Sequence, residues 1–337
     1  MSLEYDLAVK LLQSGELVAF PTETVYGLGA DAANPDAVAR IFAAKGRPAN
    51  HPVIVHLAGA GQLDQWARDI PPVAWELAEA FWPGPLTLIL KRAPAVPLAV
   101  TGGQDTVGVR VPAHPVALDL LRAYAEAGGG RGGLCGIAAP SANRFGRISP
   151  TDAAHVRDEL GDAVALVLDG GRCPVGIEST IIDLSNDNGP LRLLRPGHIT
   201  PEQIRGVVGV APESPGLRKP QQGTPRVSGS LDAHYAPRTP MRVVDTAQLR
   251  ETLAALSAAG KRFGLLVYSS PDSSASAHSL RQMPNDPEGY ARELYAALRD
   301  LDAAGNELIV VERIPESPAW AAVNDRLRRA ACGAGNS

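Results

Sequence analysis

The stretch "PTETVYGLGADA", residues 21–32, gathers side chains that could bind a small polar ligand. It follows the apolar run Leu17–Phe20, and it places Glu23 between two threonines, ahead of Gly27 and Gly29. Loops at the ends of strands present side chains and backbone amides to ligands in open α/β sheets, and glycines let the backbone approach closely. We expect a ligand site here, although a polar turn between two strands would give the same composition.

A second stretch, "AAKGRPANHPVIVH", brings cations to the end of a predicted helix and a histidine to the end of a predicted strand. Lys45 is a point charge and Arg47 a bidentate fork, a pairing that suits polyphosphates, but cations also simply complement the carboxyl end of a helix. The sequence does not decide whether His56 contacts a ligand or has a structural role. His51 and His56 would face opposite sides of a strand, so a shared metal ion is not expected.

The stretch "TVGVRVP" places a charge inside an apolar strand. By strand alternation its three valines share one face, while Thr106, Gly108 and Arg110 share the other. A buried guanidinium needs a partner, which could be an internal carboxylate or a bound anion. Gly108 would leave a notch above the sheet that a ligand could occupy.

Two later stretches, "GIAAPSANRFGRISPTDA" and "GIESTIIDL", add polar residues at the ends of further predicted strands. Ser141 and Asn143 follow one strand, and Ser149 stands before a predicted helix, where it suits either an N-cap or a phosphate seat. Ser179 enters a strand, and Arg195 of "LLRPG" leaves one.

Strands and helices alternate over residues 1–208 and predict an α/β fold around a large mixed sheet flanked by helices. The predicted strands are Leu17–Phe20, Pro52–Leu57, Leu86–Lys91, Thr106–Val111, Gly136–Ala139, Ala165–Leu168, Ser179–Leu184 and Leu191–Leu194. The predicted helices are Leu3–Gln13, Pro35–Ala44, Pro72–Phe81, Pro115–Glu126 and Thr151–Leu160.

Residues 209–240 are rich in proline, glycine and serine and read as a linker long enough to have a function. After it, residues 241–332 resume a β-α-β-α-β-α order typical of a small Rossmann-like α/β domain with a parallel sheet. The GxGxxG pattern is missing from its first strand-to-helix turn, so dinucleotide binding is not expected there.

The bulk composition narrows the class of protein. The chain of 337 residues is 45% hydrophobic and carries a formal net charge of −4, so any contact with RNA must be local. Charged residues near the N-terminus do not fit a signal peptide, and sparse cysteines, three in all, favour a reducing compartment. We expect a cytoplasmic protein without a membrane span.

In order along the chain, "PTETVYGLGADA", "KGRP…PVIVH", "FWPGPLTLIL", "VGVRVP", "APSAN…SPT", "GIESTIID", "LLRPG" and "HYAP" resemble the YrdC-like family. Within it they are similar to the long, two-domain threonylcarbamoyl-adenylate synthases, and the resemblance extends over essentially the whole chain. It implies a twisted YrdC-like mixed sheet followed by the Rossmann-like domain.

The resemblance implies a nucleotidyltransferase that converts L-threonine, bicarbonate or carbon dioxide, and ATP into L-threonylcarbamoyl-AMP and pyrophosphate. Mg²⁺ would accompany ATP, and a downstream threonylcarbamoyl-transferase complex would modify an adenosine next to the anticodon of tRNA. The implied threonine contacts are Thr24, His56, Arg110, Ala139 and Ser179. The implied ATP contacts are Lys45, Arg47, His51, Thr106, Ser141, Asn143, Ser149, Arg195, Ser230 and Tyr235. Lys45, Arg47 and Arg110 would be catalytic by neutralising charge.

Two positions depart from the family's pattern: His51 stands where asparagine is common, and the segment before "HYAP" is less basic. Two other functions stay open. One is carbamoyl transfer, whose enzymes carry cysteine pairs and extra domains that are missing here. The other is an RNA-binding module, which the net charge disfavours.

Overall fold

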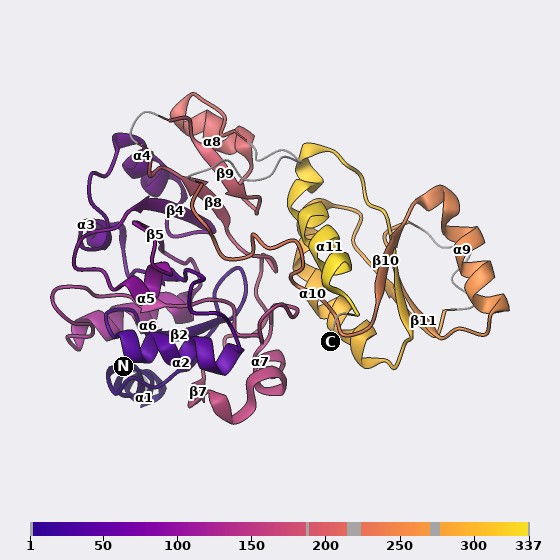
Figure 1. Cartoon of the computed structure of the whole chain (residues 1–337), viewed down its shortest axis with the longest axis horizontal. Helices are drawn as coiled ribbons and strands as arrows, with labels where there is room; N and C mark the ends of the chain where they lie inside the picture. The colour runs from indigo at the N-terminus through magenta and orange to yellow at the C-terminus, as the bar shows by residue number, and fades with distance from the viewer. Residues whose placement is uncertain (1–2, 187–188, 214–223, 270–276, 336–337) are drawn as a thin grey trace. The chain divides into compact units, whose positions relative to one another are not determined.

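The computed structural model describes residues 3–186, 189–213, 224–269 and 277–335 (Figure 1). The chain divides into two compact units. The first comprises Met1–Arg144, Pro150–Pro174 and Glu178–Ser230, and the second comprises Phe145–Ser149, Val175–Ile177 and Leu231–Ser337. The linker predicted from composition is therefore shared between the units, with Ser230 in the first and Leu231 in the second.

Within the described residues, the first unit is built on one nine-stranded mixed sheet with the order β7-β1-β2-β6-β3-β5-β4-β8-β9. The strands are β1 (Val18–Phe20), β2 (Gly27–Asp31), β3 (Ile54–His56), β4 (Leu86–Lys91), β5 (Thr106–Arg110), β6 (Ile137–Ala138), β7 (Leu166–Val167), β8 (Thr180–Asp183) and β9 (Arg192–Arg195). Strand β5 runs parallel to β3 and antiparallel to β4, and β4 runs parallel to β8. Because these four strands are neighbours, residues far apart in sequence meet at their ends.

The helices of the first unit follow their capping signals. They are α1 (Leu3–Gln13), α2 (Pro35–Lys45), α3 (Leu63–Trp66), α4 (Pro72–Phe81), α5 (Leu98–Thr101), α6 (Pro115–Glu126), α7 (Ala153–Leu160) and α8 (Pro201–Val208). The Asn34 side chain accepts hydrogen bonds from the first turn of α2, and Gly46 ends the helix in the left-handed region at φ 60°. This stop places Lys45 on the last turn and Arg47 just beyond it.

The two faces of this sheet are covered differently. Helices α1 and α6 pack together with Val18 and Phe20 on one face of β1, while Ala19 joins the larger core on the other face. The Phe20 ring meets the His56 ring edge-on at 6.2 Å, so His56 shares the face that α1 and α6 cover. Farther along this face, Val227 of the linker packs against Ile89 and Ile181.

The second unit has a four-stranded sheet of parallel strands in the order β10-β13-β11-β12 within the described residues. Its elements are β10 (Met241–Val244), α9 (Thr246–Ala258), β11 (Phe263–Val267), β12 (Ser279–Gln282), α10 (Pro287–Ala303), β13 (Leu308–Glu312) and α11 (Ala321–Gly333). Two short segments from earlier in the chain belong to this unit. For example, Ala236 donates its amide hydrogen to the carbonyl oxygen of Gly146 at 2.8 Å.

The predicted fold class is confirmed: a mixed sheet flanked by helices is followed by a parallel Rossmann-like sheet. Two strands were missed. Strand β2 reads "GLGAD" and β12 reads "SLRQ", and neither is an apolar, β-branched run. At Gly29 a Cβ atom would lie 2.9 Å from the carbonyl oxygen of Val18, which explains a glycine within β2.

One predicted helix start was wrong. Helix α7 begins at Ala153, and Asp152 caps it by accepting a hydrogen bond from the amide of Ala154. Ser149 is therefore not the N-cap of α7, and the phosphate seat predicted for it at that helix N-terminus does not follow. In the described residues, no helix is long and apolar enough to cross a membrane.

Candidate active site

The ends of β3 and β5 bring together three of the residues expected to bind threonine. His56 and Arg110 are the last residues of these parallel strands and are paired in register. Arg110 also donates from Nη1 to the Oγ1 of Thr24, in the loop after β1, at 3.0 Å. Strand pairing and one side-chain hydrogen bond thus hold the three residues together.

Ser179 and Ala139 lie next to the group formed by Thr24, His56 and Arg110. The amide of Ala139 donates to the carbonyl oxygen of Ile54 on β3 at 3.0 Å. The Oγ of Ser179 lies 2.8 Å from the Oγ1 of Thr87 on β4, and Leu88 pairs with Val109 of β5, so Thr87 lies opposite Arg110. The first unit therefore brings all five predicted threonine contacts to one region of the sheet.

Arg110 has an internal ion pair. Its Nη2 donates to Oε1 of Glu23 at 2.6 Å, and the two side chains are 4% and 7% exposed. The other oxygen of Glu23 accepts from the amide of Ala113 at 2.9 Å. Of the two partners that the sequence left open for Arg110, the structure shows the carboxylate. Arg110 is therefore not an isolated positive charge awaiting an anion.

His56 is a neutral group. Burial, reinforced by the neighbouring charge of Arg110, lowers the pKa of its imidazole to about 3. Its Nδ1 is buried and has no hydrogen-bond partner within the described chain. At neutral pH, His56 therefore offers a polar contact and no charge.

Lys45 lies at the cationic end of the site. Its Nζ donates to the backbone carbonyl oxygens of Ser141 and Asn143, and the residue is 3% exposed. Burial, together with the nearby charge of Arg47, holds the pKa of Lys45 well below its usual range. Carbonyl oxygens carry only partial charge, so a bound anion would stabilise this ammonium further.

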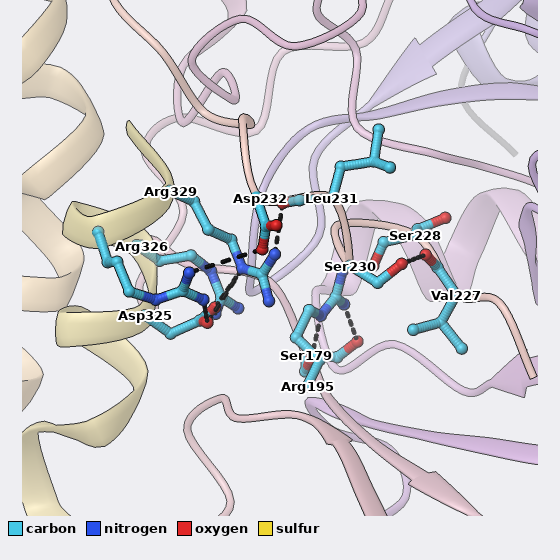
Figure 2. Close-up of polar contacts among 11 residues, drawn as sticks. Ser179, Arg195, Val227, Ser228, Ser230, Leu231, Asp232, Asp325, Arg326 and Arg329 are labelled. Atoms are coloured by element: carbon cyan, nitrogen blue, oxygen red, sulfur yellow. Dashed lines mark hydrogen bonds and ion pairs between the residues drawn. The ribbon is translucent and has the colours of Figure 1, made fainter. Parts of the chain in front are cut away.

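Two arginines converge on one residue of the linker. Arg47 donates from Nη2 to the Oγ of Ser228 at 3.2 Å and to the carbonyl oxygen of Pro52 at 2.6 Å. Arg195 donates to the carbonyl oxygen of Ser228 at 2.9 Å and reaches Ser179 through two further bonds (Figure 2). Ser179 thus contacts both Thr87 and Arg195, and it joins the threonine group to the cations.

A hollow lies over the notch that Gly108 leaves in β5. It encloses about 270 Å³ of space, counting space open to solvent. Its walls come from the sheet and from the linker segment, and they are Pro52, Val53, Ile54, Ile89, Gln104, Thr106, Gly108, Ile181, Arg226, Val227 and Ser228. Only about 10 Å³ of this space is open to the centre of a water molecule, so the hollow as it stands has room for about one water molecule.

The remaining predicted ATP contacts are more scattered. Burial and the charges of Arg47 and Arg226 lower the pKa of His51, which precedes the wall of the hollow. Ser230 is exposed and donates to the carbonyl oxygen of Val227 at 2.9 Å. Ser149 and Tyr235 belong to the second unit.

In the second unit Tyr235 is buried and has φ 60°, a left-handed conformation that is uncommon for a non-glycine residue. The Arg326 guanidinium lies 5.3 Å from the centre of its ring, and the ring of Tyr295 lies at 5.7 Å. The part of Tyr235 and Ser149 in binding ATP stays a prediction.

Sequence reasoning missed two residues of the site. Strand alternation in "LTLILK" could have found Thr87, since it shares the face that presents Arg110. No sequence signal points to Ser228, because its place depends on how the linker folds back onto the sheet.

Comparison with known proteins assigns the chain to a protein family. A family model described as "Telomere recombination", covering Sua5, YciO and YrdC, matches residues 10–197. A second model, "Threonylcarbamoyl-AMP synthase, C-terminal domain", matches residues 199–332. The chain belongs to the Sua5/YrdC family, in its two-domain form.

Its similarity to members of that family spans nearly the whole chain. It is 41% identical to the threonylcarbamoyl-AMP synthase of Pyrococcus abyssi, covering 96% of this chain and 93% of that one. It is 40% identical to the enzyme of the same name from Bacillus subtilis, covering 97% and 92%. The crystal structure of P. abyssi Sua5 complexed with L-threonine matches with a TM-score of 0.87 and 39% identity, over 98% of this chain and 94% of that one.

The pKa of His56 gives a testable prediction. The folded-state pKa is lowered, so an unfolded chain binds a proton to His56 near pH 6.5 while the folded chain does not. Stability that depends on this residue is therefore present above pH 6.5 and is lost as the pH falls toward 3. We expect NMR of ring-labelled histidine to show a His56 imidazole that stays neutral at pH 5. His278, an exposed ring in the second unit, provides the reference signal of a solvent-accessible histidine. Protonation of His56 near pH 6 would contradict the buried geometry.

Proposed function

We propose that the chain is a threonylcarbamoyl-AMP synthase, which forms L-threonylcarbamoyl-AMP and pyrophosphate from L-threonine, bicarbonate or carbon dioxide, and ATP. The product serves threonylcarbamoyladenosine modification of tRNA. The observation that carries the proposal is the position of Ser179, which is hydrogen-bonded to Thr87, the residue opposite Arg110 in the sheet, and to Arg195. An amino acid at one end and a nucleotide at the other would then lie side by side.

The threonine would lie among Thr24, His56, Arg110, Ala139 and Ser179. These residues offer hydroxyl oxygens, a neutral imidazole and a guanidinium within one region of the sheet. A zwitterionic amino acid needs acceptors for its ammonium group and donors for its carboxylate, and this set holds both kinds.

The ATP phosphates would lie toward Lys45, Arg47 and Arg195, with Ser141 and Asn143 as neighbours of Lys45. The hollow over Gly108, beside Thr106, would take another part of the nucleotide once Val227 and Ser228 of the linker move away from the sheet. His51, Ser149, Ser230 and Tyr235 complete the proposed ATP contacts. The cations are 3–8% exposed, so they suit an enclosed phosphate better than the surface of an RNA.

The reaction has two bond-forming steps. The ammonium group of threonine first loses a proton to give the free amine. The amine nitrogen then forms a bond to the carbon of carbon dioxide and gives up a second proton, or it displaces hydroxide from bicarbonate, which leaves with that proton as water. An oxygen of the resulting carbamate then attacks the α-phosphorus of ATP, and the bond to pyrophosphate breaks. Lys45 and Arg47 would neutralise charge on the phosphates during this transfer, and Arg110 would help hold the amino acid in line for attack.

Mg²⁺ would enter with ATP and neutralise phosphate charge. The described residues contain no group of three or more His, Cys, Asp or Glu side chains that could hold a metal ion by themselves.

The linker, residues 209–240, would act as a lid. Among its described residues, Val227 packs on the sheet and Ser228 contacts two arginines. Carbamates decompose in water, so a segment that closes over the site would protect the intermediate. We place the enzyme in the cytoplasm, where a downstream threonylcarbamoyl-transferase complex would take its product, with at most weak contact to tRNA itself.

The activity is tested by pyrophosphate release from ATP, with threonine or bicarbonate withheld in turn. We expect release only with both present. Serine should replace threonine at a cost of about 1 kcal/mol in kcat/KM, because it lacks one methyl group. Release that is independent of threonine would refute the proposed reaction.

Gly108→Ala tests the nucleotide end separately. The added Cβ would fill the notch 3.1 Å from Cδ1 of Ile89, a flexible side chain that can shift, so the fold should persist. We expect the KM for ATP to rise by roughly tenfold or more while the KM for threonine changes little. Gly61→Ala is the control, because a Cβ there meets nothing within 4 Å. An unchanged KM for ATP would show that the hollow is not part of the ATP-binding site.

A further inference from the structure

The Arg110–Glu23 ion pair is part of a longer chain of buried hydrogen bonds. Arg110 donates to Glu23 from Nη2 at 2.6 Å and to the Oγ1 of Thr24 from Nη1 at 3.0 Å. The Oγ1 of Thr24 lies 2.8 Å from the Oγ1 of Thr22, which donates to the carbonyl oxygen of Val25 at 2.7 Å. Glu23, Thr22 and Thr24 are all buried.

This chain has a fixed direction. A threonine hydroxyl has one hydrogen, and that of Thr22 is used on the carbonyl oxygen of Val25. The hydrogen shared between the two threonines must therefore come from Thr24. Thr24 receives a hydrogen bond from Arg110 and gives its own hydrogen to Thr22, so toward a ligand its oxygen can only accept.

Three groups remain for a ligand at this end: two buried nitrogen atoms and the second lone pair of Thr24. The Nε of Arg110 and the Nδ1 of His56 are buried and lack hydrogen-bond partners within the described chain. The Nε is a donor, and the remaining lone pair of Thr24 is an acceptor. A ligand with one carboxylate and one ammonium group would satisfy both, whereas a simple carboxylate would leave Thr24 unmatched.

Glu23 also sets the charge of this end. It cancels the charge of Arg110, while His56 is neutral, so the immediate group has no net charge. It also fixes the guanidinium, because its second oxygen is tied to the amide of Ala113 at 2.9 Å. Without the carboxylate, a buried positive charge would face the ligand's ammonium group and repel it.

We propose that Glu23 is the positioning residue that makes the amino-acid end of the site select a zwitterion over a simple carboxylate. It acts through Arg110, which it orients and neutralises, while Thr22 fixes the neighbouring Thr24 as an acceptor. The inference rests on the proposed function, since it assigns the amino acid to this end of the sheet.

The test compares two ligands that differ only in the amine. Isothermal titration would measure the affinity for L-threonine and for 3-hydroxybutanoate, which is threonine with hydrogen in place of the amine, in the presence of α,β-methylene-ATP. For the unmodified chain, threonine should bind far more tightly. For Glu23→Gln the ratio of the two affinities should fall by roughly tenfold or more, because threonine binds more weakly and the simple carboxylate does not. The affinity for the ATP analogue should change little.

Thr22→Val is a second test that leaves the ion pair of Arg110 and Glu23 in place. It can be used if the Glu23→Gln protein does not fold. Thr24 would then have its hydrogen free to donate to a carboxylate, and the ratio should fall again. Glu312→Gln is the matched control, since Glu312 is a fully buried carboxylate of the second unit that accepts several hydrogen bonds. Its ratio should stay unchanged.

A ratio that stays constant in both Glu23→Gln and Thr22→Val, with both ligands weakened equally, would overturn the inference and leave Glu23 with a purely structural role. Failure of the unmodified chain to bind threonine would instead refute the proposed function. The two failures are therefore distinguishable.

Discussion

The burial of positive charge at one end of a β-sheet is the constraint on which the site depends. Lys45, Arg47, Arg110 and Arg195 are each less than 9% exposed, in a chain whose net charge is −4. A buried cation is costly unless oxygen atoms surround it. The structure meets this need in two ways. Arg110 has a carboxylate partner, whereas the Nζ of Lys45 is held by the carbonyl oxygens of Ser141 and Asn143.

Because of this difference, the two ends of the site differ in net charge. The group around Arg110 is balanced by Glu23 and suits a ligand without net charge. Among the described residues, Lys45 contacts only the partial charges of carbonyl oxygens, and its pKa is lowered first by burial and then by the nearby charge of Arg47. Triphosphate would relieve the repulsion between these two cations. In the proposed site, this difference in electrostatic balance would let one region of the sheet bind an amino acid and a nucleotide side by side.

The linker completes this arrangement on the first unit. Ser228 accepts from Arg195 and from Arg47, and both arginines are also proposed ligands of phosphate. A phosphate that bonds these guanidinium groups would compete with Ser228. Binding of ATP and the position of the linker are therefore expected to depend on each other, which is consistent with a lid that moves during turnover.

Much of the architecture could be predicted because the relevant signals are local. Asn34, Pro35 and Gly46 fix the bounds of α2, and alternation in "TVGVRVP" places Arg110 and Gly108 on one face of β5. Strand β2 was missed because its glycines and small residues serve close packing against Phe20, a tertiary requirement that no local propensity records. From the sequence, an internal carboxylate was only one of two possible partners for Arg110. Glu23 and Arg110 are 87 positions apart in the chain, and only the order of the strands in the sheet brings them together. The start of α7 was misplaced because Ser149 and Asp152 are both good N-caps and only the folded chain selects one.

The most direct test of the account is a crystal structure of the chain with L-threonine and α,β-methylene-ATP bound together. We expect threonine beside Arg110 with the contact from Arg110 to Glu23 intact, and phosphate oxygens on Lys45, Arg47 and Arg195. Ligands in separate pockets, or a triphosphate remote from these three cations, would contradict the central claim. That claim is that the two substrates lie side by side because Arg110 is neutralised by a carboxylate and Lys45, among the described residues, is not.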